Sequence, residues 1–376
     1  MRKKPVLLPL CILLLLQGCA EQRRLEGLGI VTTAALDLND AADDPDAKAL
    51  KVAVAIKLTE AKSGPQERVI QTTDNSPKEA RNKLSRQTSQ ILVSGQLQNL
   101  IIGEKLAKRG IYDYLDSYRR DYTVSERMRI IVSKGSSIEL LSHQYKDIPE
   151  IGDYLSTLLV QEEKINESPS SSMHEFIRDY LDDGVDPIGS IIEQKNDLVE
   201  ADGIALFKGA QYVGAIAAEK STLFMMLKQS FQVGGVIIRM KDNPSGKKQS
   251  AVLSALINKR KVTVEDVGSL TSAPKVGIEI NLDSILLEYM GDKKLNSVAD
   301  REQLTKELTE AIREELEGIM KRLQQLGTDS VGIGTAVRNK MSYGAWKKTN
   351  WEQVYPKTEI KVNVKLHVRD YGMIES

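Results

Sequence analysis

Apolar residues recur along the chain in two different periods, and the alternation of these periods predicts a succession of strands and helices. In the segment 50–60, Val52, Val54, Ile56 and Leu58 fall on one side of an extended chain, which is the two-residue period of a half-buried strand. The same period predicts a β-hairpin at 203–216 and strands at 28–38, 67–73, 96–103, 128–135, 233–240, 250–257, 259–265, 274–289 and 358–372.

Helical spacing separates several of these strands. Ser76, Pro77 and Glu79 match an N-cap, a proline in the first helical turn and a capping-box glutamate. Because Leu84 and Ile91 continue the helical spacing, we expect this helix to reach about residue 91. Further helices are predicted at 104–122, with an interruption near residue 110, and at 136–145, 174–184 and 217–229.

The longest helical pattern runs from about Asp300 to Leu326 and stops at Gly327, a residue typical of helix C-termini. Its apolar residues form one stripe, which comprises Leu304, Leu308, Ile312, Leu316, Ile319, Leu323 and Leu326. Because the heptad pattern covers fewer than four repeats, we expect the helix to pack on a sheet of its own chain rather than in an intermolecular coiled coil. The final alternating segment then predicts an edge strand after the helix.

These elements predict an α+β protein with more than one domain. In the first half, strands alternate with helices, whereas in the second half several strands precede the long helix. A chain of 376 residues is about twice the usual domain size. We therefore expect mixed sheets with packed helices, divided into an N-terminal α/β domain at 19–195, possibly with two subdomains, and a C-terminal α+β domain at 199–376.

The first residues have the pattern of a secretory signal. A basic start is followed by an apolar run at 6–16, which is too short to cross a bilayer as a helix. The run ends in Leu16, Gln17, Gly18 and Cys19, a sequence typical of a bacterial lipobox. The alternative is an ordinary cleaved signal with a chance cysteine. On the lipobox interpretation, residues 1–18 are removed, and Cys19 carries the S-diacylglycerol and N-acyl groups.

Such a cysteine predicts a protein tethered to the outer face of a membrane, because two or more acyl chains anchor a protein stably. The only other cysteine, Cys11, would be lost with the signal. The mature chain would then contain no disulfide and no thiolate metal site. The chain has 52 basic and 52 acidic residues, which does not favour a nucleic-acid surface.

Candidate chemistry is sparse. Asp182, Asp183 and Asp186 have no histidine at ligand spacing, so we interpret them as a helix end and loop rather than a metal site. The three histidines belong to separate predicted elements, and no hydrolase or nucleotide-binding motif is present. Gly332 and Gly334 are interpreted as a tight turn packed near the tryptophans. We therefore expect no enzymatic activity, no metal and no cofactor.

An aromatic set near the C-terminus allows two interpretations. Tyr343, Trp346, Trp351 and Tyr355 lie close together in the sequence. They either cover the edge of the sheet as part of the core or form a docking surface for a partner subunit.

The order of the motifs along the chain resembles that of the Ger(x)C family, the lipoprotein C subunits of spore nutrient-germinant receptors. The resemblance spans almost the whole mature chain and rests on RRLEGLGIV after the lipobox, GIYDYLDSYRRD, MRIIVSKG, the hairpin DGIALFKGAQYVGAI, Asp329 with VGIGTAVR, the spaced tryptophans and the final alternating strand. One departure is Ala20, where many members have a tryptophan.

The resemblance implies a subunit without enzymatic activity on the outer face of the spore inner membrane. Its partners would be the integral-membrane A and B subunits of a receptor that starts germination in response to small nutrients. A rival interpretation from another class is a solute-binding lipoprotein of a membrane transporter. The succession of strands in the second half fits its two α/β lobes poorly.

Overall fold

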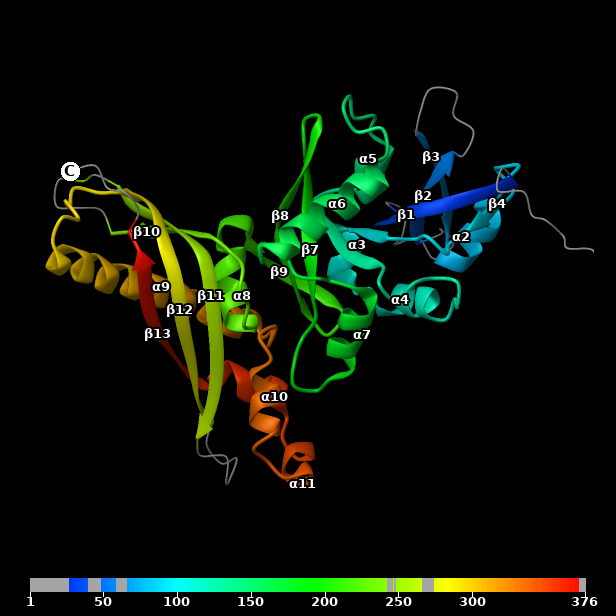
Figure 1. Cartoon of the computed structure of the whole chain (residues 1–376). Coiled ribbons are helices and arrows are strands. Elements are labelled where there is room, and N and C mark those ends of the chain that lie inside the picture. Colours follow the sequence, from blue (N-terminus) through cyan, green and yellow to red (C-terminus); the bar gives the residue numbers. More distant parts are fainter. Residues whose placement is uncertain are drawn as a thin grey trace, which may run out of the picture.

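The computed structural model describes residues 27–39, 49–58, 66–241, 246, 248–265 and 274–371. Two sheets dominate this part of the chain, and helices pack against both (Figure 1). The mixed α+β class predicted from the sequence is confirmed.

The first sheet contains nine strands of the described chain. Its central strands are parallel, and antiparallel pairs flank them on both sides. In spatial order the strands are β3 (Gln66–Asp74), β2 (Leu50–Leu58), β1 (Leu28–Leu38), β5 (Asn99–Gly103), β6 (Arg129–Ser133), β7 (Ile188–Lys195), β8 (Leu198–Lys208) and β9 (Gln211–Ala217), and β4 (Ile91–Val93) pairs with β1.

Helices cover both faces of this sheet, so that its central strands are buried on each side. One face packs against α2 (Pro77–Leu84), α3 (Glu104–Arg109), α4 (Tyr112–Arg119) and α7 (Met173–Leu181). The opposite face packs against α5 (Ser137–Ser142) and α6 (Ile151–Lys164).

The alternation in β2 shows how one strand serves both layers. Val52, Val54 and Ile56 belong to the core beneath α2 and α4, as their two-residue spacing predicts. Ala53 and Ala55 point the other way and are also fully buried, in the core beneath α5 and α6. The alternation of the large apolar residues in β2 therefore indicates only one of the two faces of the strand that are buried.

The second sheet has four strands in the described residues and carries the longest helix on one face. The order is β10 (Val236–Met240), β11 (Gln249–Glu265), β12 (Lys275–Met290) and β13 (Glu359–Asp370). Helix α9 (Val298–Leu326) connects β12 to β13, which pair in parallel. As predicted, β13 is an edge strand, and α9 packs on the sheet of its own chain.

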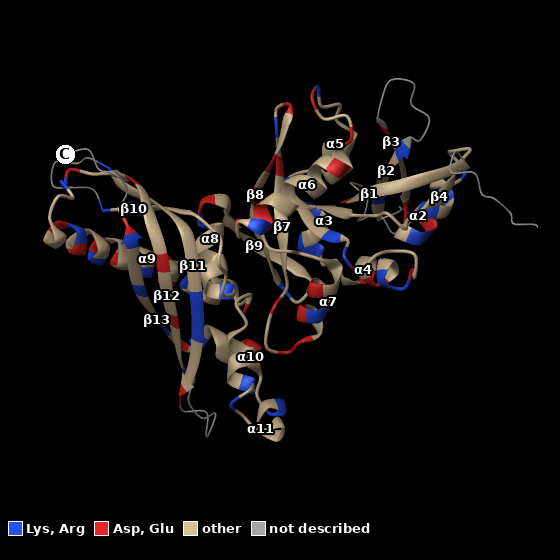
Figure 2. Cartoon of the chain, in the orientation of Figure 1, with Lys and Arg blue, Asp and Glu red and all other residues tan. Residues whose placement is uncertain are grey.

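The stripe of α9 is buried from Leu304 to Leu323, with side chains at most 3% exposed. The helix begins after Ser297, whose side chain accepts a hydrogen bond from the Asp300 amide. It ends at Gly327, which adopts a left-handed conformation with φ of 68°, as expected for a C-terminal glycine. Figure 2 shows the acidic and basic residues that the helix carries along its length.

Two local predictions are corrected by the structure, and one long helix was not predicted. Helix α2 ends at Leu84 rather than near Ile91, because Leu92 turns into the core as part of β4. The two strands predicted at 250–257 and 259–265 are one strand, β11, with a register shift near Ala255. The sequence reasoning assigned no element to α6, although its Leu155 and Leu159 are fully buried.

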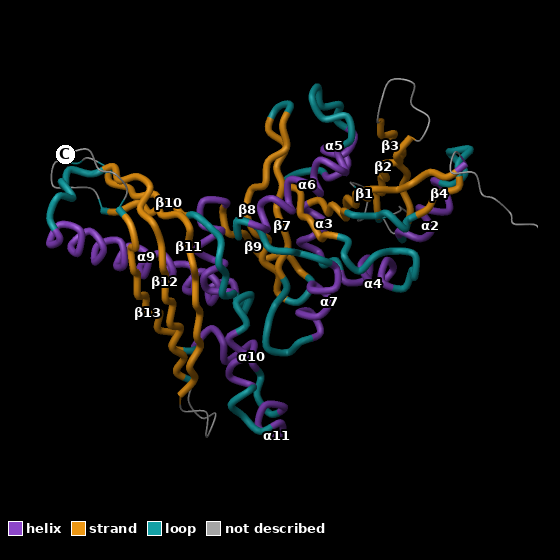
Figure 3. Tube along the Cα trace, viewed as in Figure 1, coloured by secondary structure: helices purple, strands orange, loops and turns teal. Residues whose placement is uncertain are grey.

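The two sheets share a core at their junction. Helix α8 (Ser221–Lys228) follows β9, and its side chains pack with residues of β8 and β9 as well as with α9. Short helices after α9 complete the junction (Figure 3). They are α10 (Ile333–Arg338), α11 (Tyr343–Lys347) and α12 (Trp351–Val354), followed by the 3₁₀ turn η3 (Tyr355–Lys357). The predicted domain division between 195 and 199 falls in the turn from β7 to β8, and β8 and β9 continue the first sheet.

Candidate functional site

The C-terminal aromatic set is divided between core and surface. Trp346, Trp351 and Tyr355 are 7% exposed or less, and successive rings lie 5.8 Å apart. These three residues are core, which is the first of the two interpretations of the set. Tyr343 is 77% exposed, with the Lys347 amine 5.7 Å from its ring. Of the four residues, Tyr343 alone therefore has a side chain that a partner can contact extensively.

Asp329 organises the loop beneath these aromatic rings. Its carboxylate accepts hydrogen bonds from the amides of Gly332, Ile333 and Gly334, at 3.0, 2.8 and 2.6 Å, and from the indole of Trp351 at 3.0 Å. Burial raises the pKa of Asp329 to about 6, although the hydrogen bonds from Gly334, Ile333 and Trp351 oppose this shift.

The two glycines of this loop are required by its geometry. Gly332 has φ of 79°, a conformation that residues with a Cβ rarely adopt. A Cβ on Gly334 would lie 2.4 Å from the indole nitrogen of Trp351. The structure thus agrees with the interpretation of these glycines as a tight turn near the tryptophans.

Asp186 links this loop to the first sheet. Its carboxylate accepts hydrogen bonds from the amides of Gly209, at 2.8 Å, and Asp329, at 2.7 Å. In return, the Asp186 amide donates to the Asp329 carbonyl at 3.1 Å. Burial raises the pKa of Asp186 in spite of these bonds. We call this contact between the two aspartate loops the Asp186–Asp329 joint.

Cations surround the joint and hold the same loops together. Arg338 contacts Asp182 through both terminal nitrogens, at 2.7 and 2.9 Å, and Asp183 at 2.7 Å. The Lys228 amine donates to the Ser330 carbonyl at 2.7 Å, and burial lowers its pKa. Asp182 and Asp183 thus pair with an arginine, and Asp186 accepts from backbone amides, in agreement with the interpretation of the three residues as a helix end and loop.

The three histidines lie apart and are bound to carboxylates near the surface. His143 is 3.2 Å from Asp197, and His367 is 3.0 Å from Asp283. His174 is 3.3 Å from Glu126. Among the described residues, no group of three or more His, Cys, Asp or Glu side chains has a geometry that could hold a metal ion.

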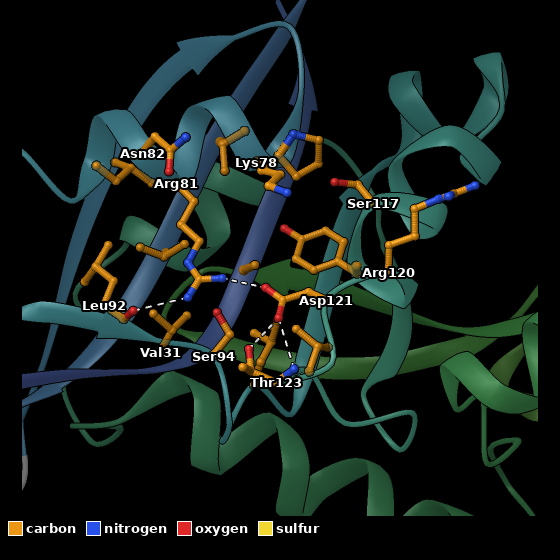
Figure 4. Close-up of a pocket in the computed structure, with 18 of the residues that line it drawn as sticks. Val31, Lys78, Arg81, Asn82, Leu92, Ser94, Ser117, Arg120, Asp121 and Thr123 are labelled. Atoms are coloured by element: carbon orange, nitrogen blue, oxygen red, sulfur yellow. Dashed lines mark hydrogen bonds and ion pairs between the residues drawn. The ribbon is translucent and has the colours of Figure 1, made fainter.

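A pocket lies in the N-terminal half, between α2, α4 and the face of β1 and β2 (Figure 4). Its volume is about 430 Å³. Buried side chains from the two strands, including Val31, Val52 and Val54, line it together with Leu92 and Leu97. The sequence reasoning missed this pocket because its lining comes from segments that are far apart in the chain.

Polar groups face the same pocket from α2 and the end of α4. Arg81 contacts Asp121 at 2.5 Å and donates to the Leu92 carbonyl at 3.3 Å. Burial tends to raise the pKa of Asp121, but hydrogen bonds from Thr123 and the charge of Arg81 outweigh it, so the pKa is lowered. Burial raises the pKa of the Tyr118 hydroxyl, an effect that Arg81 reduces.

The predicted lipidation residue Cys19 and the lipobox residues Leu16, Gln17 and Gly18 lie outside the described residues. Within the part of the chain that the structure describes, no helix is both long enough and apolar enough to cross a membrane.

Comparison with known proteins places the whole chain in one family. The model of the "Spore germination protein N-terminal domain" matches residues 21–194. The model of the "Spore germination B3/ GerAC like, C-terminal" domain matches residues 202–372. The two matches follow each other along the chain and together cover most of it.

Two curated relatives align with this chain over nearly their full length. The spore germination protein GerQC of Bacillus cereus is 23% identical over 358 residues, which cover 95% of this chain and 96% of the relative. The putative spore germination protein YfkR of Bacillus subtilis (strain 168) is also 23% identical, over 94% of this chain and 93% of its own.

A solved structure has the same fold. The crystal structure of the GerBC protein aligns with a TM-score of 0.52 at 14% identity, over 89% of this chain and 97% of that one. The resemblance inferred from the order of the motifs is thus confirmed, and the chain belongs to the Ger(x)C family of spore germination proteins.

Proposed function

We propose that this protein is the lipid-anchored C subunit of a nutrient germinant receptor, located on the outer face of the spore inner membrane. The observation that carries the proposal is the tandem match of both family domains directly behind the lipobox at residues 16–19. On this proposal the chain assembles with integral-membrane A and B subunits and contributes to signalling. It acts by binding and placement, without enzymatic activity.

The distance from the anchor limits where the folded part can lie. Leu28, the first residue of β1, follows Cys19 by only nine positions. Nine residues span at most about 30 Å when fully extended. With Cys19 lipidated, the start of β1 therefore stays within that distance of the membrane surface. Confinement to the membrane plane also raises the effective concentration of the subunit near its partners, so that individual contacts can be weak.

Two substitutions in the lipobox test this proposal. Cys19→Ala removes the acyl acceptor, and we expect the variant to leave the membrane fraction of spores and to lose nutrient-induced germination. Gln17→Ala is the matched control, because alanine is common at this lipobox position and the cysteine is kept. Both variants are compared with the parent protein by immunoblotting of washed spore membranes and by germination assays.

The measurements separate anchoring from folding. The released Cys19→Ala protein should melt at the temperature of the parent chain, because the substitution precedes β1 and leaves every described residue unchanged. Retention of the variant in membranes after a high-salt wash would contradict the tether. Unchanged germination by a variant that has left the membrane would contradict the placement role.

A further inference from the structure

We propose that the pocket between α2 and α4 binds a small amphipathic anion, a carboxylate carried on an apolar body. This inference concerns the folded chain alone and does not depend on the lipid anchor or on the receptor partners. It rests on three features of the pocket: an apolar floor, hydrogen-bond donors on one side, and a lysine at the rim that pairs with no described residue.

The floor is suited to an apolar body. Val31, Val52 and Val54 line it from the sheet, and Leu92 and Leu97 extend it. Each of these side chains is at most 9% exposed. A volume of about 430 Å³ lies within the range of about 300–1,000 Å³ that is usual for small-molecule sites. An alkyl or branched chain of several carbons would cover the floor and release the water above it.

The donors favour an anionic group. Arg81 and Tyr118 both line the pocket, and the two groups are close enough that Arg81 affects the pKa of the tyrosine. Burial keeps the Tyr118 hydroxyl protonated, and this hydroxyl has no hydrogen-bond partner among the described residues. A hydroxyl held inside a pocket without a protein partner is a donor for a ligand, and the positive charge of a guanidinium that lines the same pocket favours a carboxylate over a neutral group.

The rim adds positive charge. Lys78, Arg81 and Arg120 line the pocket together with one acidic side chain, Asp121, but the Arg120 side chain extends away from the pocket (Figure 4) and pairs with Asp116 at 2.6 Å. Since Arg81 is paired with Asp121, the remaining positive charge belongs to Lys78. Lys78 forms no ion pair with a described residue. Asp121 occupies one terminal nitrogen of Arg81, and the Leu92 carbonyl accepts from the other, so both compete with a bound carboxylate for the guanidinium. Removing the Asp121 charge therefore separates a ligand site, which should bind more tightly, from an ion pair that only stabilises the fold.

The test uses the mature chain from residue 19 with Cys19→Ala, which keeps every described element. Octanoate, octanol and octylammonium are titrated into the purified protein and followed by isothermal calorimetry. We expect one saturable site for octanoate, at least tenfold weaker binding of octanol, and no binding of the cation. Hexanoate should bind about tenfold more weakly than octanoate, because it buries two methylene groups fewer.

Variants in the pocket identify the groups that bind. Arg81→Gln should weaken octanoate binding at least tenfold, and Tyr118→Phe should weaken it severalfold. Asp121→Asn should tighten binding, because it frees Arg81 from one of its two competitors. Lys83→Gln is the control, since Lys83 lies on the same helix but bonds to the Thr73 carbonyl and does not line the pocket.

Several outcomes would overturn the proposal. The absence of a saturable heat when octanoate is titrated to millimolar concentration, into a protein that melts cooperatively, would exclude the site. Equal affinity for octanol and octanoate excludes the anion selectivity. Weakened binding in Asp121→Asn, parallel to that in Arg81→Gln, would assign the ion pair a structural role instead. The comparison of the three probes on the unsubstituted pocket does not depend on the folding of any pocket variant.

Discussion

The pocket between α2 and α4 and the Asp186–Asp329 joint both place an aspartate among apolar side chains, but they differ in what their polar groups contact. In the joint, the buried Asp329 carboxylate accepts four hydrogen bonds from the chain. In the pocket, the Tyr118 hydroxyl has no such partner in the described chain, and Arg81 is partly exposed beside Asp121. Buried groups whose hydrogen bonds are satisfied support the fold, whereas accessible groups with unused donors are available to a ligand.

The largest difference in stability between the two regions should appear when Asp329 of the joint or Asp121 of the pocket is replaced by alanine. Asp329→Ala leaves the amides of Ile333 and Gly334 and the Trp351 indole without an acceptor in a buried place, whereas the Gly332 amide keeps the residue 329 carbonyl. We expect a loss of about 3–5 kcal/mol in the free energy of unfolding. Asp121→Ala removes a partly exposed ion pair and two exposed hydrogen bonds from Thr123, whose donors can turn to water, and should cost about 1 kcal/mol. Urea denaturation of both variants measures the two values, and equal losses would remove the distinction between joint and pocket.

A smaller effect tests the close packing of the joint. Gly334→Ala places a methyl group against the Trp351 indole, and we expect it to cost about 1–3 kcal/mol. Gly344→Ala is the matched control, because no atom lies within 4 Å of the added methyl and the residue is inside α11. That control should raise the stability by up to about 1 kcal/mol. Thermal melts of the two variants should therefore shift in opposite directions.

The smallest effect on stability is expected at the exposed end of the aromatic set. Tyr343→Ala should change the free energy of unfolding by no more than about 0.5 kcal/mol, since the ring is largely in solvent. If the ring docks a partner, spores with this variant should germinate poorly although the subunit is stable. Leu287→Ala, which removes another exposed apolar side chain, is the control. Normal germination with Tyr343→Ala would exclude docking through this residue.

Elements with a strong local period could be predicted from the sequence. The α9 stripe, its stop at Gly327 and the alternation of β13 each follow from residues that are neighbours in the chain. Helix α2 shows the limit of this reasoning. Leu84 and Ile91 have helical spacing, but the pairing of β4 with β1 decides the structure after Leu84. A tertiary contact here overrides the local pattern.

The candidate sites were less accessible to sequence reasoning. The sequence indicated that the glycines near Asp329 form a turn by the tryptophans, but Asp186 comes from a loop far upstream. Likewise, the pocket combines β1, α2 and the end of α4. Arg81 lies on α2 between the buried residues Ala80 and Leu84, but many exposed helices carry a charged residue in such a place, so this pattern does not indicate a pocket. Sites of this kind depend on topology rather than on motifs.

The parallel pairing of β12 with β13 has a consequence for the order in which the chain folds. β12 cannot acquire this neighbour until α9 and the three short helices after it have formed or at least emerged, because β13 follows all of them. A chain that emerges with its N-terminus first therefore carries one side of β12 unpaired for the whole of that interval. Pairings over such long sequence separations form slowly, and open strand edges promote association between chains. Truncation before Glu359 should accordingly produce aggregation rather than a smaller folded protein.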